Sequence, residues 1–127
     1  MNKVVIGVGS NIHPARNISE ARRILSQKYY IIRESHFVTT KPIGNETQPD
    51  FVNGAILIET ACDRETLVKE LKDIERALGR PADHKRSAPR TIDLDIVVYN
   101  GEVVDQDFYR RDFLKHAVLE LLPALKY

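Results

Sequence analysis

Residues 90–99 read Arg90-Thr91-Ile92-Asp93-Leu94-Asp95-Ile96-Val97-Val98-Tyr99. This stretch predicts a β-strand, because β-branched and aliphatic residues dominate it and neither Gly nor Pro interrupts it. Side chains alternate between the two faces of a strand. One face is therefore predicted to carry Ile92, Leu94, Ile96 and Val98, and it belongs against a core. The opposite face carries Asp93 and Asp95, side by side.

The two carboxylates of Asp93 and Asp95 repel each other when both are ionised, so the pair needs cations nearby. Hard divalent ions that prefer oxygen ligands, Mg²⁺ above all, suit such a pair. The alternative is an exposed strand whose two acids face water and neighbouring Lys or Arg side chains. Asp-x-Asp by itself does not separate the two interpretations.

The loop before this strand is rich in cations. It reads Gly79-Arg80-Pro81-Ala82-Asp83-His84-Lys85-Arg86-Ser87-Ala88-Pro89-Arg90. Arginine binds phosphate oxygens in pairs and keeps its charge. A basic loop that leads into a Mg²⁺-binding carboxylate pair suits a polyphosphate substrate, and a solvated, charge-rich loop is the alternative.

Length and composition restrict the class of protein. The chain has 127 residues, which predicts one domain over 1–127, and its net charge of +1 gives no support to binding of nucleic acid or of a membrane surface. Cys62 is the only cysteine, which excludes an intrachain disulfide and a cysteine-based metal site. With no signal sequence or long apolar run, we expect a cytoplasmic protein. No pattern in the sequence specifies an oligomeric state.

Hydrophobic periodicity and turn residues predict the remaining elements. In chain order they are a strand over 4–9, a helix after Pro14, a long strand over 29–40, a polar loop over 41–50, a strand over 51–59, a helix that Asp63 caps and Gly79 ends, the strand described above, a short strand at 103–104 and a C-terminal helix ending at Pro123. The order β-α-β-β-α-β predicts an α+β, ferredoxin-like fold. Both of its helices are expected on one face of an antiparallel sheet, with Asp93 and Asp95 on the other.

Three polar or aromatic residues beside predicted strands are further candidates. Asn11 either caps the first helix or faces the substrate, with equal weight. Asn53 lies inside an apolar strand and needs a hydrogen-bond partner if it is buried, which is either neighbouring backbone or the edge of a ligand. Phe51, on the same face as Asn53, offers a flat surface for stacking a heterocycle.

Several of these stretches together resemble one enzyme family. Gly79-Arg80 followed by Pro89-Arg90-Thr91-Ile92-Asp93-Leu94-Asp95-Ile96 is similar to the signature of the 6-hydroxymethyl-7,8-dihydropterin pyrophosphokinases of folate synthesis. Gly9-Ser10-Asn11 and Pro49-Asp50-Phe51-Val52-Asn53 fit the same family in the same order. The resemblance covers roughly residues 3–104, and the Pro-Arg-x-Ile-Asp-Leu-Asp piece is its most specific part.

The resemblance implies a reaction and a set of site residues. The family transfers the β,γ-pyrophosphoryl group of ATP to the hydroxymethyl group of a reduced pterin and releases AMP. By motif match, Asp93 and Asp95 would hold two Mg²⁺ ions, and Arg80 and Arg90 would be catalytic. The pterin site would comprise Thr40, Ile43, Phe51, Asn53 and Phe113. The ATP site would comprise Glu75, Arg80, Arg90 and Arg111.

The chain also departs from the family pattern. Ala82 stands where another Arg is usual, and Ser87 where an aromatic residue is frequent. The segment between Val104 and Phe113 is short and lacks a stretch that normally contributes to the ATP site. A short-form enzyme with weaker ATP binding is therefore expected. The alternatives are a pterin- or nucleotide-binding paralogue without turnover and, less favoured, a ferredoxin-like RNA-binding module.

Overall fold

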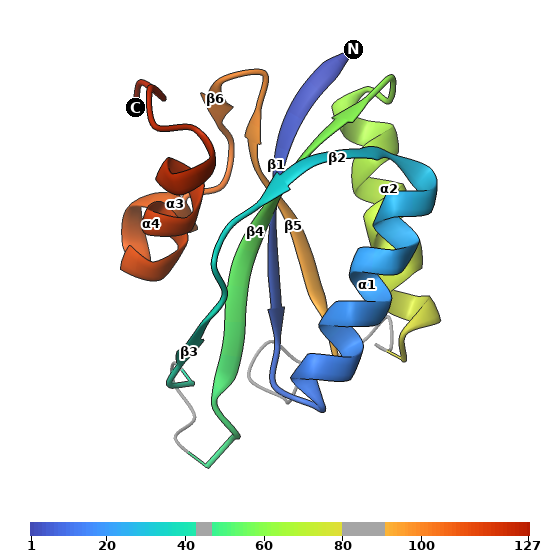
Figure 1. Ribbon diagram of the computed structural model, residues 1–127, viewed down its shortest axis with the longest axis vertical. Helices are drawn as coiled ribbons and strands as arrows, with labels where there is room; N and C mark the ends of the chain where they lie inside the picture. Colours follow the sequence, from blue (N-terminus) through green and yellow to red (C-terminus); the bar gives the residue numbers. More distant parts are fainter. Residues whose placement is uncertain (43–46, 80–90) are drawn as a thin grey trace.

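The computed structural model describes residues 1–42, 47–79 and 91–127. Its elements are β1 (Asn2–Ser10), α1 (Pro14–Lys28), β2 (Tyr30–Glu34), β3 (Val38–Thr40), β4 (Phe51–Thr60), α2 (Arg64–Ala77), β5 (Asp93–Tyr99), β6 (Glu102–Val103), α3 (Asp107–Arg110) and α4 (Asp112–Leu121). One sheet stands between two groups of helices (Figure 1).

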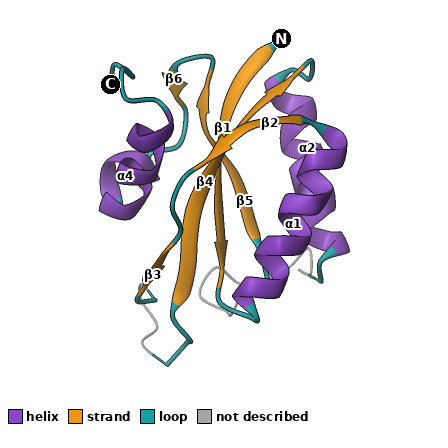
Figure 2. Cartoon of the chain, in the orientation of Figure 1, coloured by secondary structure: helices purple, strands orange, loops and turns teal. Residues whose placement is uncertain are grey.

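The sheet has the order β2-β4-β1-β5-β6, and β3 pairs with β4 beyond the end of β2. The strands β2, β4, β1 and β5 pair in the antiparallel order of the ferredoxin-like fold, which confirms the predicted fold class. The helices α1 and α2 lie together on one face, as predicted (Figure 2). The C-terminal helix α4 packs against β4 on the opposite face and covers part of it.

The two faces of the sheet bury two hydrophobic clusters. Beneath α1 and α2, Val4, Ile6 and Val8 of β1 pack with Leu25 and Leu71. On the other face, Val5 packs in a cluster with Phe108 and Val118 from the C-terminal helices. Because β1 is apolar on both faces, its sequence shows a near-continuous apolar run rather than an alternating one.

The strand β5 departs from regular alternation at Val97. Val5 of β1 pairs with Val98, whereas the next residue of β1, Ile6, pairs with Ile96, so Val97 is an extra residue in β5. This bulge turns Val98 toward the α4 face, where it lies in the same cluster as Val5. The prediction that Val98 shares a face with Ile96 was therefore wrong, because alternation follows the sequence only while the pairing is unbroken.

The long strand predicted over 29–40 is two strands, β2 and β3. Between them, the hydroxyl of Ser35 accepts a hydrogen bond from the amide of Ala55 at 2.8 Å, and the amide of Ser35 donates to the carbonyl of Ala55 at 2.9 Å. Phe37 packs directly on Gly54, where a Cβ atom would stand 2.6 Å from the ring. The side-chain pairing of Ser35 thus interrupts the ladder and lets Phe37 turn into the α1 face.

The residues predicted to begin and end α2, and to form the turn after β5, do so in the structure. Asp63 caps α2 by accepting a hydrogen bond from the amide of Thr66 at 2.8 Å, and Gly79 follows its end with φ of 102°. Asn100 and Gly101, with φ of 49° and 82°, form the tight turn between β5 and β6. Within the described residues, no helix is both long and apolar enough to cross a membrane.

Candidate active site

Two glycines of β1 open a space in the α4 face of the sheet. Gly9 pairs with Asn53 of β4 on one side and with Asp93 of β5 on the other. Gly7, two residues earlier on the same face, pairs with Asp95. Because neither glycine has a side chain, the polar groups of β4 and β5 face each other across an empty strip of β1 backbone.

This strip is the floor of a cavity of about 140 Å³. The cavity is lined by Gly7, Val8, Gly9, Asn53, Gly54, Asp93, Asp95, Val97, Asp105, Asp107, Arg111, Phe113 and Leu114. It therefore brings together Asn53 and Phe113, which were predicted for a pterin, with both carboxylates that were predicted for a metal. Arg111, predicted for ATP, lies in the same lining.

The side chain of Asn53 has a defined orientation in this cavity. Its amide nitrogen donates a hydrogen bond to the hydroxyl of Thr40 at 2.6 Å, which joins two residues predicted for the same ligand. Its amide oxygen lies over Gly9, so close that a Cβ atom there would be 2.7 Å away. Thr40 in turn pairs with Phe51, a third predicted residue, at the end of β3.

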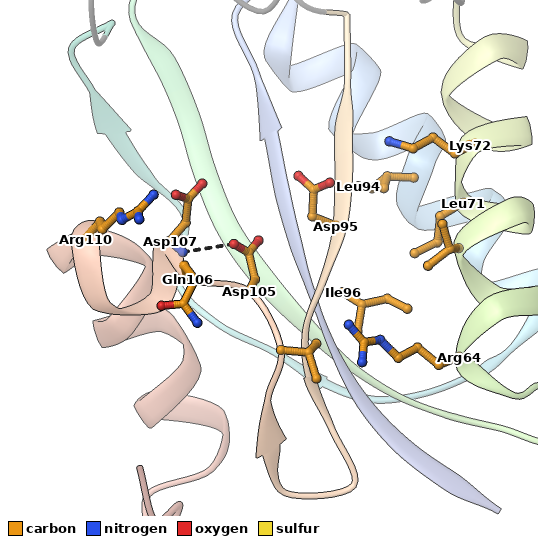
Figure 3. Close-up of a pocket in the computed structure, with 12 residues that line it drawn as sticks. Arg64, Leu71, Lys72, Leu94, Asp95, Ile96, Asp105, Gln106, Asp107 and Arg110 are labelled. Atoms are coloured by element: carbon orange, nitrogen blue, oxygen red, sulfur yellow. Dashed lines mark hydrogen bonds between the residues drawn. The ribbon is translucent and has the colours of Figure 1, made fainter.

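A larger cavity, of about 430 Å³, lies between α2, the outer edge of β5 and the segment before α3 (Figure 3). Its lining includes the cations Arg64, Lys72 and Arg110 and the carboxylates Asp95, Asp105 and Asp107. The three carboxylates also line the smaller cavity, so the two cavities adjoin at these side chains.

Backbone hydrogen bonds bring Asp105 and Asp107 to this position. The amide of Val104 donates to the carbonyl of the bulged residue Val97 at 2.8 Å, which holds the chain against β5 after the turn. Asp105 then accepts a hydrogen bond from the amide of Asp107 at 2.9 Å, at the start of α3 (Figure 3). The shortness of this segment predicts a loss of ATP contacts, and no signal in the sequence shows that its acids join Asp95.

Asp95 is perturbed electrostatically by these surroundings. Desolvation by the surrounding protein is the main cause that raises its pKa from 3.8 to about 6, and the charges of Asp93 and Glu75 raise it further, while Lys72 opposes them. The residue nevertheless stays exposed to solvent. A crowded carboxylate that solvent still reaches gains from a cation that binds beside it.

The donor set fits a Mg²⁺ ion that shares its coordination with other molecules. Asp93 and Asp95 project from the same face of β5, as the alternation predicted. The described residues contain no group of three or more His, Cys, Asp or Glu side chains arranged to hold a metal. Mg²⁺ typically takes one or two carboxylates and completes its shell with water and substrate phosphates, so two protein ligands are sufficient.

Glu75 lies outside the linings of both cavities. It is 2% exposed on the buried side of α2, and its Oε2 accepts a hydrogen bond from the amide of Leu94 at 2.7 Å. Its Oε1 lies 3.5 Å from Nζ of Lys72. Glu75 is the residue for which the resemblance implied a nucleotide contact, and here it contacts the backbone between Asp93 and Asp95.

The turn after β1 anchors two neighbouring segments. The hydroxyl of Ser10 donates a hydrogen bond to the carbonyl of Thr91 at 2.6 Å. The side-chain amide of Asn11 donates to Oε1 of Gln48 at 2.9 Å, while the residue that precedes α1 as its N-cap is His13. The interpretation of Asn11 as a helix cap was therefore wrong. The predicted residues Ile43, Arg80 and Arg90 lie outside the described residues.

Cations on α2 and α3 were also missed by the sequence analysis. Arg64, Lys72 and Arg110 line the larger cavity, but they are distant in sequence and none belongs to a recognisable motif. The helical spacing of Arg64 and Lys72, about two turns apart on α2, was the available signal that they share one face.

Comparisons with known proteins identify relatives of this chain. The family model described as 7,8-dihydro-6-hydroxymethylpterin-pyrophosphokinase matches residues 5–123. A Haemophilus influenzae protein named 2-amino-4-hydroxy-6-hydroxymethyldihydropteridine pyrophosphokinase is 32% identical over 94% of this chain and 81% of its own length. A Bacillus subtilis protein of the same name is 33% identical over 84% of this chain and 66% of its own length. A "Folate synthesis bifunctional protein" of Arabidopsis thaliana is 32% identical over 94% of this chain, which spans 27% of that protein.

Proposed function

This chain belongs to the 7,8-dihydro-6-hydroxymethylpterin-pyrophosphokinase family, and we propose that it transfers pyrophosphate from MgATP to 6-hydroxymethyl-7,8-dihydropterin in folate synthesis. In this reaction the hydroxymethyl oxygen bonds to the β-phosphorus of ATP. The bond from that phosphorus to the oxygen that bridges it to the α-phosphorus breaks, and AMP leaves. The hydroxyl proton passes to solvent. We assign the reaction to a single cytoplasmic domain over 1–127 that acts on small molecules, without nucleic acid or membrane.

The observation that carries the proposal is the pair of cavities that adjoin at Asp95. The smaller cavity, with the Asn53 amide on one wall and the Phe113 ring in its lining, suits a flat heterocycle with hydrogen-bonding edges. The larger cavity, with cationic side chains at its walls, suits a nucleotide and its phosphates. Two substrates bound in this way would meet over the carboxylates.

The proposed roles of the side chains follow from this placement. Asp93 and Asp95 would hold Mg²⁺, which neutralises the phosphate charge that develops during the transfer. Thr40 would hold the amide of Asn53 in the orientation that meets the pterin edge, with Ile43, Phe51 and Phe113 completing that site. Arg80, Arg90 and Arg111 remain proposed residues of the ATP side, and Glu75 would act on that side through the backbone of Leu94 rather than by touching the nucleotide. Transfer of this kind depends on positioning and charge stabilisation, so no side-chain nucleophile is required.

A binding paralogue without turnover is the second candidate. It is favoured by Asp105 and Asp107, because a stretch before Phe113 normally contributes to the ATP site in the family, and this short segment carries two acids instead. An RNA-binding module is disfavoured, since the carboxylates on the open face would repel a phosphate backbone.

The decisive experiment measures AMP release from ATP with Mg²⁺, with and without 6-hydroxymethyl-7,8-dihydropterin. We expect pterin-dependent AMP formation that EDTA abolishes and that the Asp95→Asn variant lacks. Formation of ADP, or AMP release that does not depend on pterin, would contradict the proposed reaction. Binding of both ligands by calorimetry without AMP formation would favour the binding paralogue.

A further inference from the structure

The buried carboxylate of Glu75 lies behind the wall of the larger cavity: its contacts Lys72 and Leu94 line that cavity, and Glu75 itself does not. Glu75 is 2% exposed and is surrounded by the apolar residues of α2 that form the core, among them Leu71 and Ile74. Burial of a carboxylate is strongly unfavourable unless hydrogen bonds and opposite charge compensate for it. Its contacts therefore have to be strong.

Glu75 makes a charge-assisted hydrogen bond to the strand β5. Its Oε2 accepts from the amide of Leu94 at 2.7 Å, while Lys72 approaches Oε1 at 3.5 Å. The ladder of β5 with β1 runs along the other edge of β5, and β6 pairs only with Val98 and Tyr99. At Leu94, Glu75 thus takes the place that a neighbouring strand would occupy.

The contact bears on the site because Leu94 lies between the two proposed metal ligands. Asp93 and Asp95 flank Leu94 on either side, and both of their side chains leave the strand on the opposite face. The separation and direction of the two carboxylates depend on the backbone path through Leu94. A hydrogen bond that fixes the position of the Leu94 amide therefore also limits how far the two carboxylates can move relative to each other.

We propose that Glu75 is a positioning residue, which orders the Asp93-Leu94-Asp95 backbone from α2 and thereby sets the geometry of the metal-binding carboxylates. The metal role of these carboxylates rests on the function proposed above; the contact between Glu75 and Leu94 does not. Reach is the property that matters most in this role, because a shorter side chain on α2 cannot meet the amide.

Two variants separate reach from charge. Glu75→Gln keeps the length and an acceptor oxygen but loses the charge, whereas Glu75→Asp keeps the charge but loses one methylene of reach. Asp73→Ala removes a carboxylate from the exposed side of α2, where its side chain is 70% exposed, and serves as the control. The measurements are hydrogen exchange of the Leu94 amide, Mn²⁺ affinity without substrates, pterin affinity, and kcat with KM for MgATP.

For Glu75→Asp we expect Leu94 exchange at least tenfold faster, Mn²⁺ affinity and kcat each reduced at least tenfold, and pterin affinity changed less than about twofold. Glu75→Gln should keep the Leu94 protection and lose no more than about threefold in kcat, and the Asp73→Ala control should match the wild type. If Glu75→Gln is the defective variant and Glu75→Asp is not, or if only the KM for MgATP rises, Glu75 acts directly on the nucleotide and the proposal is overturned. A wild-type protein without pyrophosphokinase activity would refute the proposed function, whereas exchange of Leu94 would still test the contact with Glu75.

Discussion

Replacement of Gly9 by Ala is expected to weaken pterin binding about thirtyfold. A Cβ atom at Gly9 would stand 2.7 Å from the amide oxygen of Asn53, which is closer than Cβ atoms come to other heavy atoms in proteins. The φ of Gly9 lies outside the left-handed region, so its backbone conformation is open to Ala. The Asn53 side chain has to rotate away. It then loses its hydrogen bond to Thr40 and the orientation that we propose for the pterin edge.

The magnitude follows from the bonds that the ligand loses. The Thr40 bond is absent from the free variant and from its complex alike, so it lowers stability and does not change Kd. The Asn53 amide can offer the pterin edge its oxygen and its second N–H, and at about 1 kcal/mol net for each neutral hydrogen bond their loss amounts to about 2 kcal/mol. That free energy corresponds to about a thirtyfold rise in Kd, since about 1.4 kcal/mol is tenfold. Calorimetric titration with 6-hydroxymethyl-7,8-dihydropterin or an oxidised analogue measures it directly.

Gly7→Ala is the matched control for this prediction. It adds the same methyl group to the same strand and the same face, but its nearest neighbours are Val97 at 3.2 Å and Leu114 at 3.5 Å, and Asn53 is not among them. We expect a smaller loss of affinity, less than about threefold, with any effect concentrated in thermal stability. If a folded Gly9→Ala protein binds pterin within twofold of the wild type, the role of Asn53 is wrong.

Three further predictions concern the carboxylates. Asp95→Asn should lower pyrophosphoryl transfer more than about a hundredfold. It should not lower the melting temperature, because it relieves the repulsion with Asp93. A variant that unfolds, or that keeps wild-type activity in Mg²⁺, would show that Asp95 has another role. Folding raises the pKa of Asp95 from 3.8 to about 6, so the stability that its protonation gives the metal-free protein is full below about pH 4 and is lost as the pH rises through about 6. Melts of the wild type should therefore lose stability relative to Asp95→Asn across this window, and a constant difference would contradict the shift. Because the short segment that carries Asp105 and Asp107 lacks a stretch that normally contributes to the ATP site, MgATP should bind about ten- to a hundredfold more weakly than to the Haemophilus influenzae relative. The loss corresponds to about 1.5–3 kcal/mol for one charge-assisted contact. Equal affinities in calorimetric titrations would refute this.

The parts of the fold that the sequence predicted are those governed by local rules. Asp63 and Gly79 delimit α2 through contacts within one helical turn, and Asn100-Gly101 forms its turn from its own backbone preferences. Asp93 and Asp95 share a face because strand geometry alone places residues two apart on the same side. None of these features requires knowledge of a distant partner.

The parts that the sequence did not predict depend on distant partners. The bulge at Val97 is defined by pairing with β1, and the break after β2 by the hydrogen bonds between Ser35 and Ala55. Glu75 has the helical position of a residue at the edge of the buried stripe, and only the packing of α2 on β5 shows that it meets Leu94. Asp105 reaches Asp95 only because the chain turns back along β5 after the bulge.

The bulge at Val97 also bears on the order in which the site forms during folding. The hydrogen bond between Val104 and Val97 closes a short loop across the tight turn, and it brings Asp105 toward Asp95 with little loss of chain entropy. Asn53, Gly9 and Asp93, in contrast, lie side by side only when β4, β1 and β5 pair, and these strands are far apart in sequence. Contacts between distant segments are slow to form. We therefore expect the acidic side of the site to assemble early, as a hairpin, and the Asn53 side to be completed only when the whole sheet closes.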